Sequence, residues 1–303
     1  MGLDYVIISN IITDDVVLAD GTEHQALLGG AGTYAVSGAR IWADRVGIVS
    51  GVGQDFDALY GAWFARNGID CAGLTVRDLH TPHSWVRYAA DGERTETPQF
   101  GSEHFRQMEP WPIHMPVEYW RARGIYVFRD ATRAYWQELF LLRPATSGVL
   151  MWEIAASAAH QTSWNDVAWI LPQVDLFSLN LTEGRMLTGL DEPDAIVDRL
   201  LNAGAGVVAL RQGARGALVA DEHRRLRIPA CPVTVVDVTG GGNAFCGGFL
   251  AGYCESAADL HTAGFYGSVS ASFVIEQYGQ PPDLRDVRES ARARVHALQS
   301  NAL

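Results

Sequence analysis

Lysine is absent from this sequence. All 23 basic residues among its 303 amino acids are arginines. Without a lysine, the chain cannot form a Schiff base with a carbonyl substrate, and it cannot build a phosphate-binding loop of Walker type, in which a lysine contacts the phosphates. A small anion can still be held locally by arginines and backbone amides.

Cysteine is scarce, and long apolar runs are missing. The four cysteines, Cys71, Cys231, Cys246 and Cys254, form no CxxC pair and no zinc spacing, so we interpret them as buried small residues in a reducing compartment. The nine histidines form no HxxxH or HxH pattern, which disfavours a zinc site. No apolar run reaches the ~18 residues of a membrane span, and the first residues lack the basic segment of a signal peptide. We therefore expect a soluble cytoplasmic protein.

Positive charge is in the minority. The formal net charge is −12 and the isoelectric point is about 5.1. This balance argues against a nucleic-acid or anionic-membrane partner, because phosphate backbones are bound by basic surfaces. Hydrophobic residues make up 48% of the chain, which is enough to cover both faces of a buried sheet. We expect one domain that spans residues 1–303.

Strand-like and helix-like patterns alternate along most of the chain. Short β-branched runs at residues 5–8 and 46–50 are typical of buried strands, and the small and apolar residues at 33–42 fit a helix between them. Further strands and helices alternate from residue 124 to residue 211. This order predicts an α/β fold with a mostly parallel central sheet and helices on both faces. In such sheets, ligands bind beyond the carboxyl ends of the strands.

Two segments interrupt the alternation. Residues 84–88 alternate polar and apolar side chains, and Ala90-Asp91-Gly92-Glu93 is typical of a hairpin turn, so we expect a strand pair that is exposed on one face. Residues 103–119 contain prolines at 110, 112 and 116, and we expect them to form a connector over the surface.

The strongest chemical signal is the glycine-rich segment Asp237–Phe245. A strand-like run ends just before it, three consecutive glycines leave room for a ligand, and the following apolar positions share one face of a helix. Unpaired N–H groups at a helix start bind anions together with the helix dipole, and a transferring phosphoryl group is a candidate. A tight turn that needs glycine only for its backbone angles is the alternative, and this pattern alone leaves both open.

This segment resembles the second signature of the ribokinase-like (PfkB) carbohydrate kinases, Asp-Thr-x-Gly-Ala-Gly-Asp-x-Phe. Asp237, Thr239, Gly240, Gly242 and Phe245 agree with it, Val238 and Gly241 depart mildly, and Asn243 stands where the family has its catalytic aspartate. Leu28-Gly29-Gly30 and residues 46–55 resemble the first signature, Asn180-Leu181-Thr182-Glu183 matches Asn-x-x-Glu, and residues 207–217 resemble the strand and loop that flank the nucleotide. The resemblance spans residues 5–282. It implies a ribokinase-like three-layer sandwich with a small β lid from about 13–28 and 80–105.

The resemblance also implies roles for individual residues. Asp14, Gly29 and Gly30 would bind the acceptor, and Thr33 is the closest substitute for an asparagine that the family has after the glycines, in a loop that is one residue shorter here. The residues implied at the nucleotide are Asn180, Glu183, Arg211, Gly213, Gly216 and Thr239, and the catalytic set is Asp237, Gly240, Gly241, Gly242 and Asn243. Glu183 would organise Mg²⁺. Simpler roles stay open: a solvated turn for Asp14, a helix cap for Asn180 and Glu183, and surface solvation for Arg211.

The implied reaction is the transfer of phosphate from ATP, with Mg²⁺, to an alcohol group of a sugar or nucleoside. The family's aspartate takes the proton of that alcohol, and the carboxamide of Asn243 cannot, although a general base contributes only ~10²–10⁴-fold. Two hypotheses follow: a kinase in which Asp14 or Asp237 takes the proton, and a pseudokinase that binds nucleotide or metabolite and acts through a partner. The retained glycines, Asp237 and the Asn180/Glu183 pair favour the kinase. A homodimer through the lid is a further hypothesis.

Overall fold

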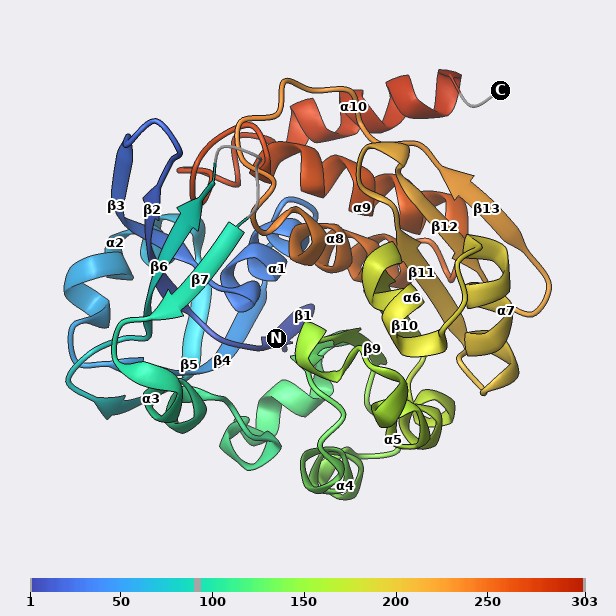
Figure 1. Ribbon diagram of the computed structural model, residues 1–303, viewed down its shortest axis with the longest axis horizontal. Helices are drawn as coiled ribbons and strands as arrows, with labels where there is room; N and C mark the ends of the chain where they lie inside the picture. The colour runs from blue at the N-terminus through green and yellow to red at the C-terminus, as the bar shows by residue number, and fades with distance from the viewer. Residues whose placement is uncertain (1, 90–93, 302–303) are drawn as a thin grey trace.

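A nine-stranded sheet forms the centre of the molecule. The computed structural model describes residues 2–89 and 94–301, so the expected turn at residues 90–93 lies outside the described residues. The strands follow the order β13-β12-β11-β10-β9-β8-β1-β4-β5. Helices cover both faces, which gives the predicted three-layer arrangement (Figure 1).

Most strands of this sheet are parallel. They are β1 (Tyr5–Ile8), β4 (Val46–Gly53), β5 (Ile69–Asp78), β8 (Gly124–Arg129), β9 (Val149–Ile154), β10 (Leu176–Asn180), β11 (Val207–Arg211), β12 (Ala217–Ala220) and β13 (Arg225–Ile228). Only β12 and β13 pair antiparallel with their neighbours. On β1, Tyr5 and Ile7 join the core on one face, whereas Val6 and Ile8 join the core on the other. Burial on both faces explains why this strand is apolar throughout.

The helices form two layers. One face carries α1 (Ala31–Arg40), α2 (Ala62–Asn67), α8 (Gly241–Glu255), α9 (Leu260–Val274) and α10 (Arg288–Asn301); the other carries α4 (Arg133–Leu142), α5 (Trp164–Ile170), α6 (Leu181–Thr188) and α7 (Pro193–Asn202). Single turns lie at Asp57–Gly61, Pro112–His114, Val117–Arg121, Ala156–Ala158, Gln161–Ser163, Leu171–Gln173 and Gly213–Arg215. Helix α8 packs between α1 and α9, across β8, β9 and β10. Its first residues therefore lie over the middle of the sheet.

A second, small sheet has the strand order β3-β2-β6-β7. Its strands are β2 (Ile12–Val17), β3 (Glu23–Gly29), β6 (His83–Tyr88) and β7 (Arg94–Pro98). Strands β6 and β7 are the expected antiparallel pair, and β6 runs parallel to β2. We call this sheet the lid. It stands beside α1 and α8 in Figure 1.

The prediction of a surface connector at residues 103–119 was wrong in part. Helix α3 (Gly101–Met108) occupies its first half, and Met108, Met115 and Tyr119 are buried. The three prolines interrupt the segment without keeping all of it at the surface: Ile113 and Val117 are exposed, whereas Met108, Met115 and Tyr119 are not. All four cysteines are free. Among the described residues, no helix is long and apolar enough to cross a membrane.

Candidate active site

The glycine segment opens helix α8. Gly240 is the N-cap with φ 74°, the Ala244 N–H donates to the Gly240 carbonyl at 2.9 Å, and the Gly241 N–H donates to Val238 at 3.2 Å. The N–H groups of Gly242 and Asn243 have no acceptor within the part of the chain that the structure describes, and no side chain there caps the helix. Together with the dipole of a 15-residue helix, they form an anion-binding position.

Glycine is required at position 240 for two reasons. A φ of 74° lies in the left-handed region that side chains disfavour. A Cβ at this position would also lie 2.1 Å from the ring of Tyr34, which α1 packs directly against the loop. The turn therefore needs glycine at position 240 whether or not the segment binds an anion, and the anion-binding role stays a prediction.

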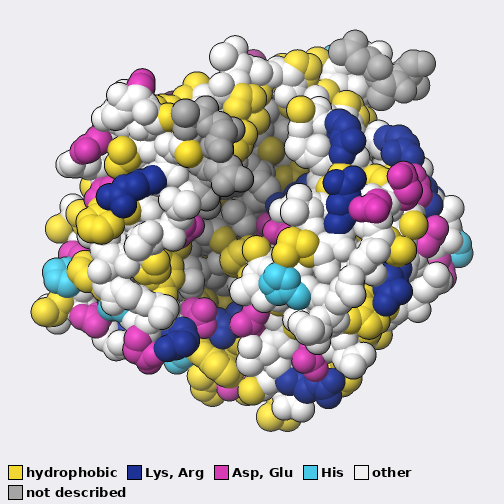
Figure 2. Space-filling view, viewed as in Figure 1, with side chains coloured by type: hydrophobic (Ala, Val, Ile, Leu, Met, Phe, Trp, Pro, Cys, Tyr) yellow, Lys and Arg dark blue, Asp and Glu magenta, His cyan; other side chains and the backbone are white. Residues whose placement is uncertain are grey.

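A pocket of about 290 Å³ opens where the lid, α1 and the start of α8 meet. Its lining residues are Asn10, Ile12, Asp14, Gly30, Ala31, Tyr34, Val86, Glu96, Phe105, Phe128, Thr239, Gly240 and Asn243. The face seen in Figure 2 is hollowed between the lid and the rest of the molecule. From the main sheet come Asn10, which follows β1, and Phe128 near the end of β8, as expected for an open α/β sheet, whereas Ile12 and Asp14 come from β2 of the lid.

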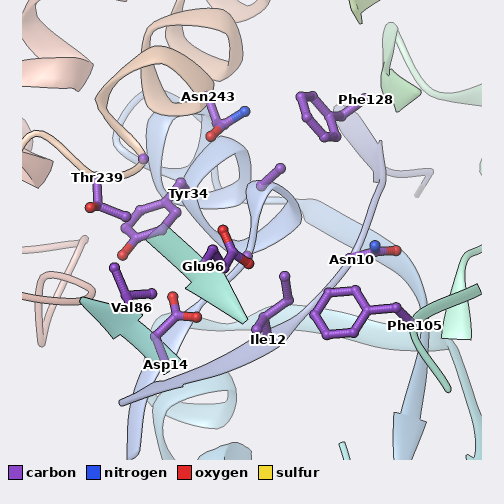
Figure 3. A pocket seen from close by; sticks show the side chains of 13 residues that line it. Asn10, Ile12, Asp14, Tyr34, Val86, Glu96, Phe105, Phe128, Thr239 and Asn243 are labelled. Carbon is purple, nitrogen blue, oxygen red and sulfur yellow. The ribbon is translucent and has the colours of Figure 1, made fainter. Parts of the chain in front are cut away.

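The pocket has an acidic lid side and an amide on the opposite side. Asp14 on β2 and Glu96 on β7 both line it, and Glu96 Oε1 accepts a hydrogen bond from Ser84 Oγ at 3.1 Å. Figure 3 shows the two carboxylates facing the pocket from the lid and Asn243 facing it from α8. Phe105 and Phe128 add two aromatic walls. This set suits a molecule that carries hydroxyl groups and a flat apolar part.

Asn243 is held by a buried tyrosine. Its Nδ2 lies 3.4 Å from the hydroxyl of Tyr126, and that hydroxyl donates to Glu153 Oε2 at 2.6 Å. Burial, and then the nearby Glu153, raise the pKa of Tyr126 well above its ordinary value, so Tyr126 stays protonated and can accept from the amide. The Oδ1 atom of Asn243 remains as a hydrogen-bond acceptor for a ligand.

Beneath the glycines lies a buried ionic cluster from neighbouring strand ends. Arg211, the last residue of β11, places its Nη2 atom 2.8 Å from Glu153 Oε1 and 3.7 Å from Glu183 Oε2. A Cβ on Gly242 would lie 1.9 Å from Arg211 Nη1, so glycine is what admits the guanidinium there. Burial alone would lower the pKa of Arg211, but the two carboxylates outweigh it and raise the pKa. The arginine is therefore charged and adjoins the anion-binding position.

Asn180 and Glu183 form a capping box at the start of α6. The Asn180 side chain accepts from the Glu183 N–H at 2.9 Å, and Glu183 Oε2 accepts from the Asn180 N–H at 2.7 Å. This is the simpler of the two roles that the sequence left open. The expectation that Glu183 is a magnesium ligand is not supported, because its Oε2 already faces a backbone N–H and Arg211. No group of three or more metal-binding side chains exists among the described residues.

Asp237 and Thr239 connect the glycine segment to the lid. The Tyr88 hydroxyl on β6 donates to Asp237 Oδ1 at 2.8 Å and lies 3.0 Å from Thr239 Oγ1. The same carboxylate oxygen accepts from the Thr239 N–H at 2.9 Å. Asp237 is buried and is not among the pocket residues. Its carboxylate is thus used to join the lid to the loop, which argues against a role as the base.

The expected role of Thr33 is also corrected. Its hydroxyl donates to the carbonyls of Gly29 at 2.5 Å and Gly30 at 2.9 Å, and the residue is fully buried. The next residue, Tyr34, lines the pocket instead. Of the two glycines, Gly30 is the N-cap of α1 and lines the pocket, whereas Gly29 ends β3.

The expected nucleotide residues Gly213 and Gly216 lie in the loop between β11 and β12. This loop follows Arg211, so it belongs to the sheet edge that carries the ionic cluster. Neither glycine lines the pocket beneath the lid. Their assignment to the nucleotide stays a prediction.

Eight pocket residues were not predicted: Asn10, Ile12, Ala31, Tyr34, Val86, Glu96, Phe105 and Phe128. Asn10 follows β1 and Phe128 lies at the end of β8, so the rule that ligands bind beyond strand ends would have found both. Glu96 and Phe105 reach the pocket only through the pairing of the lid strands and the placement of α3. No local sequence signal marks them.

The chain was compared with known proteins. The pfkB family carbohydrate kinases match residues 3–285. A cytidine kinase from Thermococcus kodakarensis is 28% identical over 258 residues, which cover 83% of this chain and 88% of that protein.

Solved structures share the fold. An adenosine kinase from Sinorhizobium meliloti superposes with a TM-score of 0.80 at 18% identity, covering 97% of this chain and 99% of that chain. An E. coli protein named as a ribokinase II, in complex with ATP and Mg²⁺, superposes with a TM-score of 0.77 at 17% identity and the same coverage. These solved structures share the fold of this chain, and the family match covers residues 3–285. This chain belongs to the pfkB family of carbohydrate kinases.

Proposed function

We propose that this protein transfers phosphate from ATP to an alcohol group of a nucleoside-like small molecule. The observation that carries the proposal is that Gly240 and Asn243 belong both to the anion-binding start of α8 and to the lining of the pocket. A phosphoryl group bound at those N–H groups would face an alcohol bound in the pocket. Such placement of two reactants is the main requirement for phosphoryl transfer.

The acceptor is proposed from the lining. The carboxylates of Asp14 and Glu96 would accept hydrogen bonds from hydroxyl groups of a ribose. Phe105 and Phe128 would contact the flat face of a base. A cavity of about 290 Å³ is near the lower limit of small-molecule sites, at roughly 300 Å³. Relatives named as a cytidine kinase and an adenosine kinase support a nucleoside acceptor, and the E. coli structure named as a ribokinase is the reason to test sugars beside nucleosides.

In the proposed reaction, the acceptor oxygen bonds to the γ-phosphorus and the bond from that phosphorus to the β–γ bridging oxygen breaks. The N–H groups of Gly242 and Asn243 and the guanidinium of Arg211 would stabilise the negative charge on the transferred group. Asn243 Oδ1 would accept a hydrogen bond from a second hydroxyl group of the acceptor and so orient the reacting one. We assign the proton to Asp14, because Asp237 already accepts bonds from Tyr88 and Thr239.

Magnesium accompanies ATP in the E. coli relative. The residues here do not fit a protein-held magnesium ion, since Glu183 caps α6 and faces Arg211. The proposed mechanism therefore includes ATP and no step that depends on a metal ligand from this chain. A homodimer through the lid, whose Trp85 is 40% exposed, remains a prediction; sedimentation that detects only monomer at high concentration would refute it.

A pseudokinase is the second candidate. The asparagine at position 243 and the arginine against Glu153 and Glu183 favour it, because together they replace the expected base and fill the expected metal site. In that case the pocket and the anion-binding loop would bind ligands without turnover, and the lid would report binding to a partner.

The test combines calorimetry with a turnover assay. We expect the purified protein to bind ATP and to form ADP in the presence of one or more members of a panel of nucleosides and sugars, with nucleosides preferred. No ATP binding would overturn the kinase proposal. ATP binding without ADP formation for any acceptor, in the native protein and in Asn243→Asp, would favour the pseudokinase.

A further inference from the structure

The ionic cluster beneath α8 replaces an arrangement that the family membership implies. A divalent cation would need oxygen ligands at the strand ends next to the phosphates, and the carboxylates there are Glu153 and Glu183. In this chain, the Arg211 guanidinium stands against both of them. A positive charge that belongs to the protein therefore occupies the region in which a bound metal ion would be expected.

Three of the four carboxylate oxygens are already engaged. Glu153 accepts from the Tyr126 hydroxyl with one oxygen and faces Arg211 with the other, and it is 2% exposed. Glu183 Oε2 accepts from the Asn180 N–H and lies 3.7 Å from Arg211. Mg²⁺ requires oxygen ligands at ~2.0–2.1 Å in near-octahedral geometry. It could bind Glu153 only by displacing the arginine or the tyrosine, and Glu183 would offer it Oε1 alone, next to the positive charge of Arg211.

Arg211 also has hydrogen-bond donors that its ion pairs do not use. Both ion-pair contacts use Nη2. The buried Nε atom has no hydrogen-bond partner within the described part of the chain. Nη1 lies where a side chain on Gly242 would be, directly beside the first unpaired N–H groups of α8. A planar guanidinium in this position is suited to a phosphate oxygen, which it can bind through two parallel N–H groups.

We propose that Arg211 takes the place of a protein-held divalent cation, so that this chain binds the terminal phosphate of a nucleotide through Arg211 and the N–H groups of α8 without needing a metal ion. The inference rests on the proposed function, since it concerns the same nucleotide. It goes further by assigning the compensation of the phosphate charge to one side chain, Arg211.

The first test is ATP binding by titration calorimetry, with EDTA and with excess MgCl₂ at equal ionic strength. The inference expects Kd values within about threefold of each other. A Kd at least thirtyfold weaker in EDTA would overturn the inference and leave the proposed function intact. No binding under either condition would overturn both, so the two failures are distinguishable.

The second test removes the guanidinium. Arg211→Gln should weaken ATP binding in EDTA at least tenfold and make it magnesium-dependent, because Glu153 and Glu183 are then open to a cation. Arg143→Gln is the matched control: Arg143 also contacts a carboxylate, Asp175 at 3.2 Å, but at the opposite, amino-terminal edge of the sheet. The control should leave the Kd for ATP unchanged both in EDTA and in MgCl₂. Equal magnesium response in the native protein and Arg211→Gln would contradict the inference.

Arg211→Gln leaves the buried Glu153 without its ion-pair partner, so a second variant must separate a loss of binding from a loss of the folded state. The double variant Glu153→Gln/Arg211→Gln removes both charges and should retain the native thermal transition while losing the metal-free affinity. Gly242→Ala provides an independent probe, because its Cβ would displace Nη1. It should weaken metal-free ATP binding in the native background and have little further effect on Arg211→Gln. Additive effects would place Arg211 outside the phosphate site.

Discussion

The lid side and the α8 side of the pocket differ in which chemistry they retain. On the lid side, Asp14 lies where the family resemblance expects a carboxylate for the acceptor, and Glu96 adds a second one. On the α8 side, the glycines remain, but the base position is Asn243 and the metal position faces Arg211. Recognition of the acceptor and binding of the phosphate can therefore be tested separately. Each variant below except Tyr88→Phe is expected to affect one side and leave the other unchanged.

Asn243→Asp should produce the largest effect. A carboxylate at this position would take the acceptor's proton, so we expect kcat to rise roughly 10²-fold, within the usual contribution of a general base. The Kd for ATP should change less than about threefold, since the N–H groups and Arg211 are retained. Asn202→Asp, which adds the same charge at the exposed end of α7, is the control for net charge. An unchanged kcat with an accepted nucleoside would show that Asp14 already acts as effectively as an aspartate at position 243 would.

Gly240→Ala should have the next largest effect, on stability. An alanine at this position would have to adopt a φ of 74°, and its Cβ would lie 2.1 Å from the Tyr34 ring. We expect a loss of about 3 kcal/mol in the free energy of unfolding, from backbone strain plus the displaced aromatic ring. Gly213→Ala is the matched control, because Gly213 also has positive φ, of 60°, but its Cβ would meet nothing within 4 Å. It should lose only about 1 kcal/mol. If urea unfolding gives equal losses of unfolding free energy for the two variants, the Tyr34 ring moves aside at little energetic cost.

The fold could be predicted from the sequence because its signals are local. The buried run at Tyr5–Ile8 and the glycine-opened helix at 240–242 each follow from neighbouring residues, and the resemblance joined them into one architecture. Thr33 shows the limit of this reasoning. Adjacent helix positions differ by about 100° around the axis, so the choice between Thr33 and Tyr34 depends on how α1 is rotated against its neighbours.

The rest of the site depends on contacts between distant segments. The Arg211 guanidinium meets Glu153 from another strand and Gly242 from another helix, and nothing near residue 211 indicates either contact. Solvation and phosphate binding therefore stayed equally open for it. The lid contact of Tyr88 spans 149 positions in the sequence to Asp237. Long-range side-chain pairs of this kind are set by tertiary packing, which periodicity does not encode.

Asp14→Asn tests the lid side. The amide keeps the shape of the carboxylate and loses its charge, so a hydroxyl group of the acceptor would be bound less strongly, and kcat should fall as well because the proposed base is lost. Hydrogen bonds to a charged group are worth about 1.5–3 kcal/mol, which corresponds to a rise of roughly tenfold or more in the KM for the acceptor. ATP binding in the absence of acceptor should not change. Glu96→Gln should act in the same direction, and Glu103→Gln, on the exposed first turn of α3, is the control. A weaker Kd for ATP in Asp14→Asn would contradict the separation of the two sides.

Tyr88→Phe should produce the smallest effect. It is the one variant that removes a contact between the lid side and the α8 side of the pocket. It removes the hydroxyl that joins β6 to Asp237 and Thr239, and a hydrogen bond to a carboxylate is worth about 1.5–3 kcal/mol. Part of that cost falls on lid closure, so the KM for the acceptor should rise several-fold and ADP formation without acceptor should increase as water enters. Thermal stability should change little, because the core on both faces of the sheet is untouched. The ratio of ADP to phosphorylated product measures directly how much ATP is hydrolysed by water instead of being used for the acceptor. If that ratio stays at the native value while the KM rises, Tyr88 orients the acceptor side without closing it.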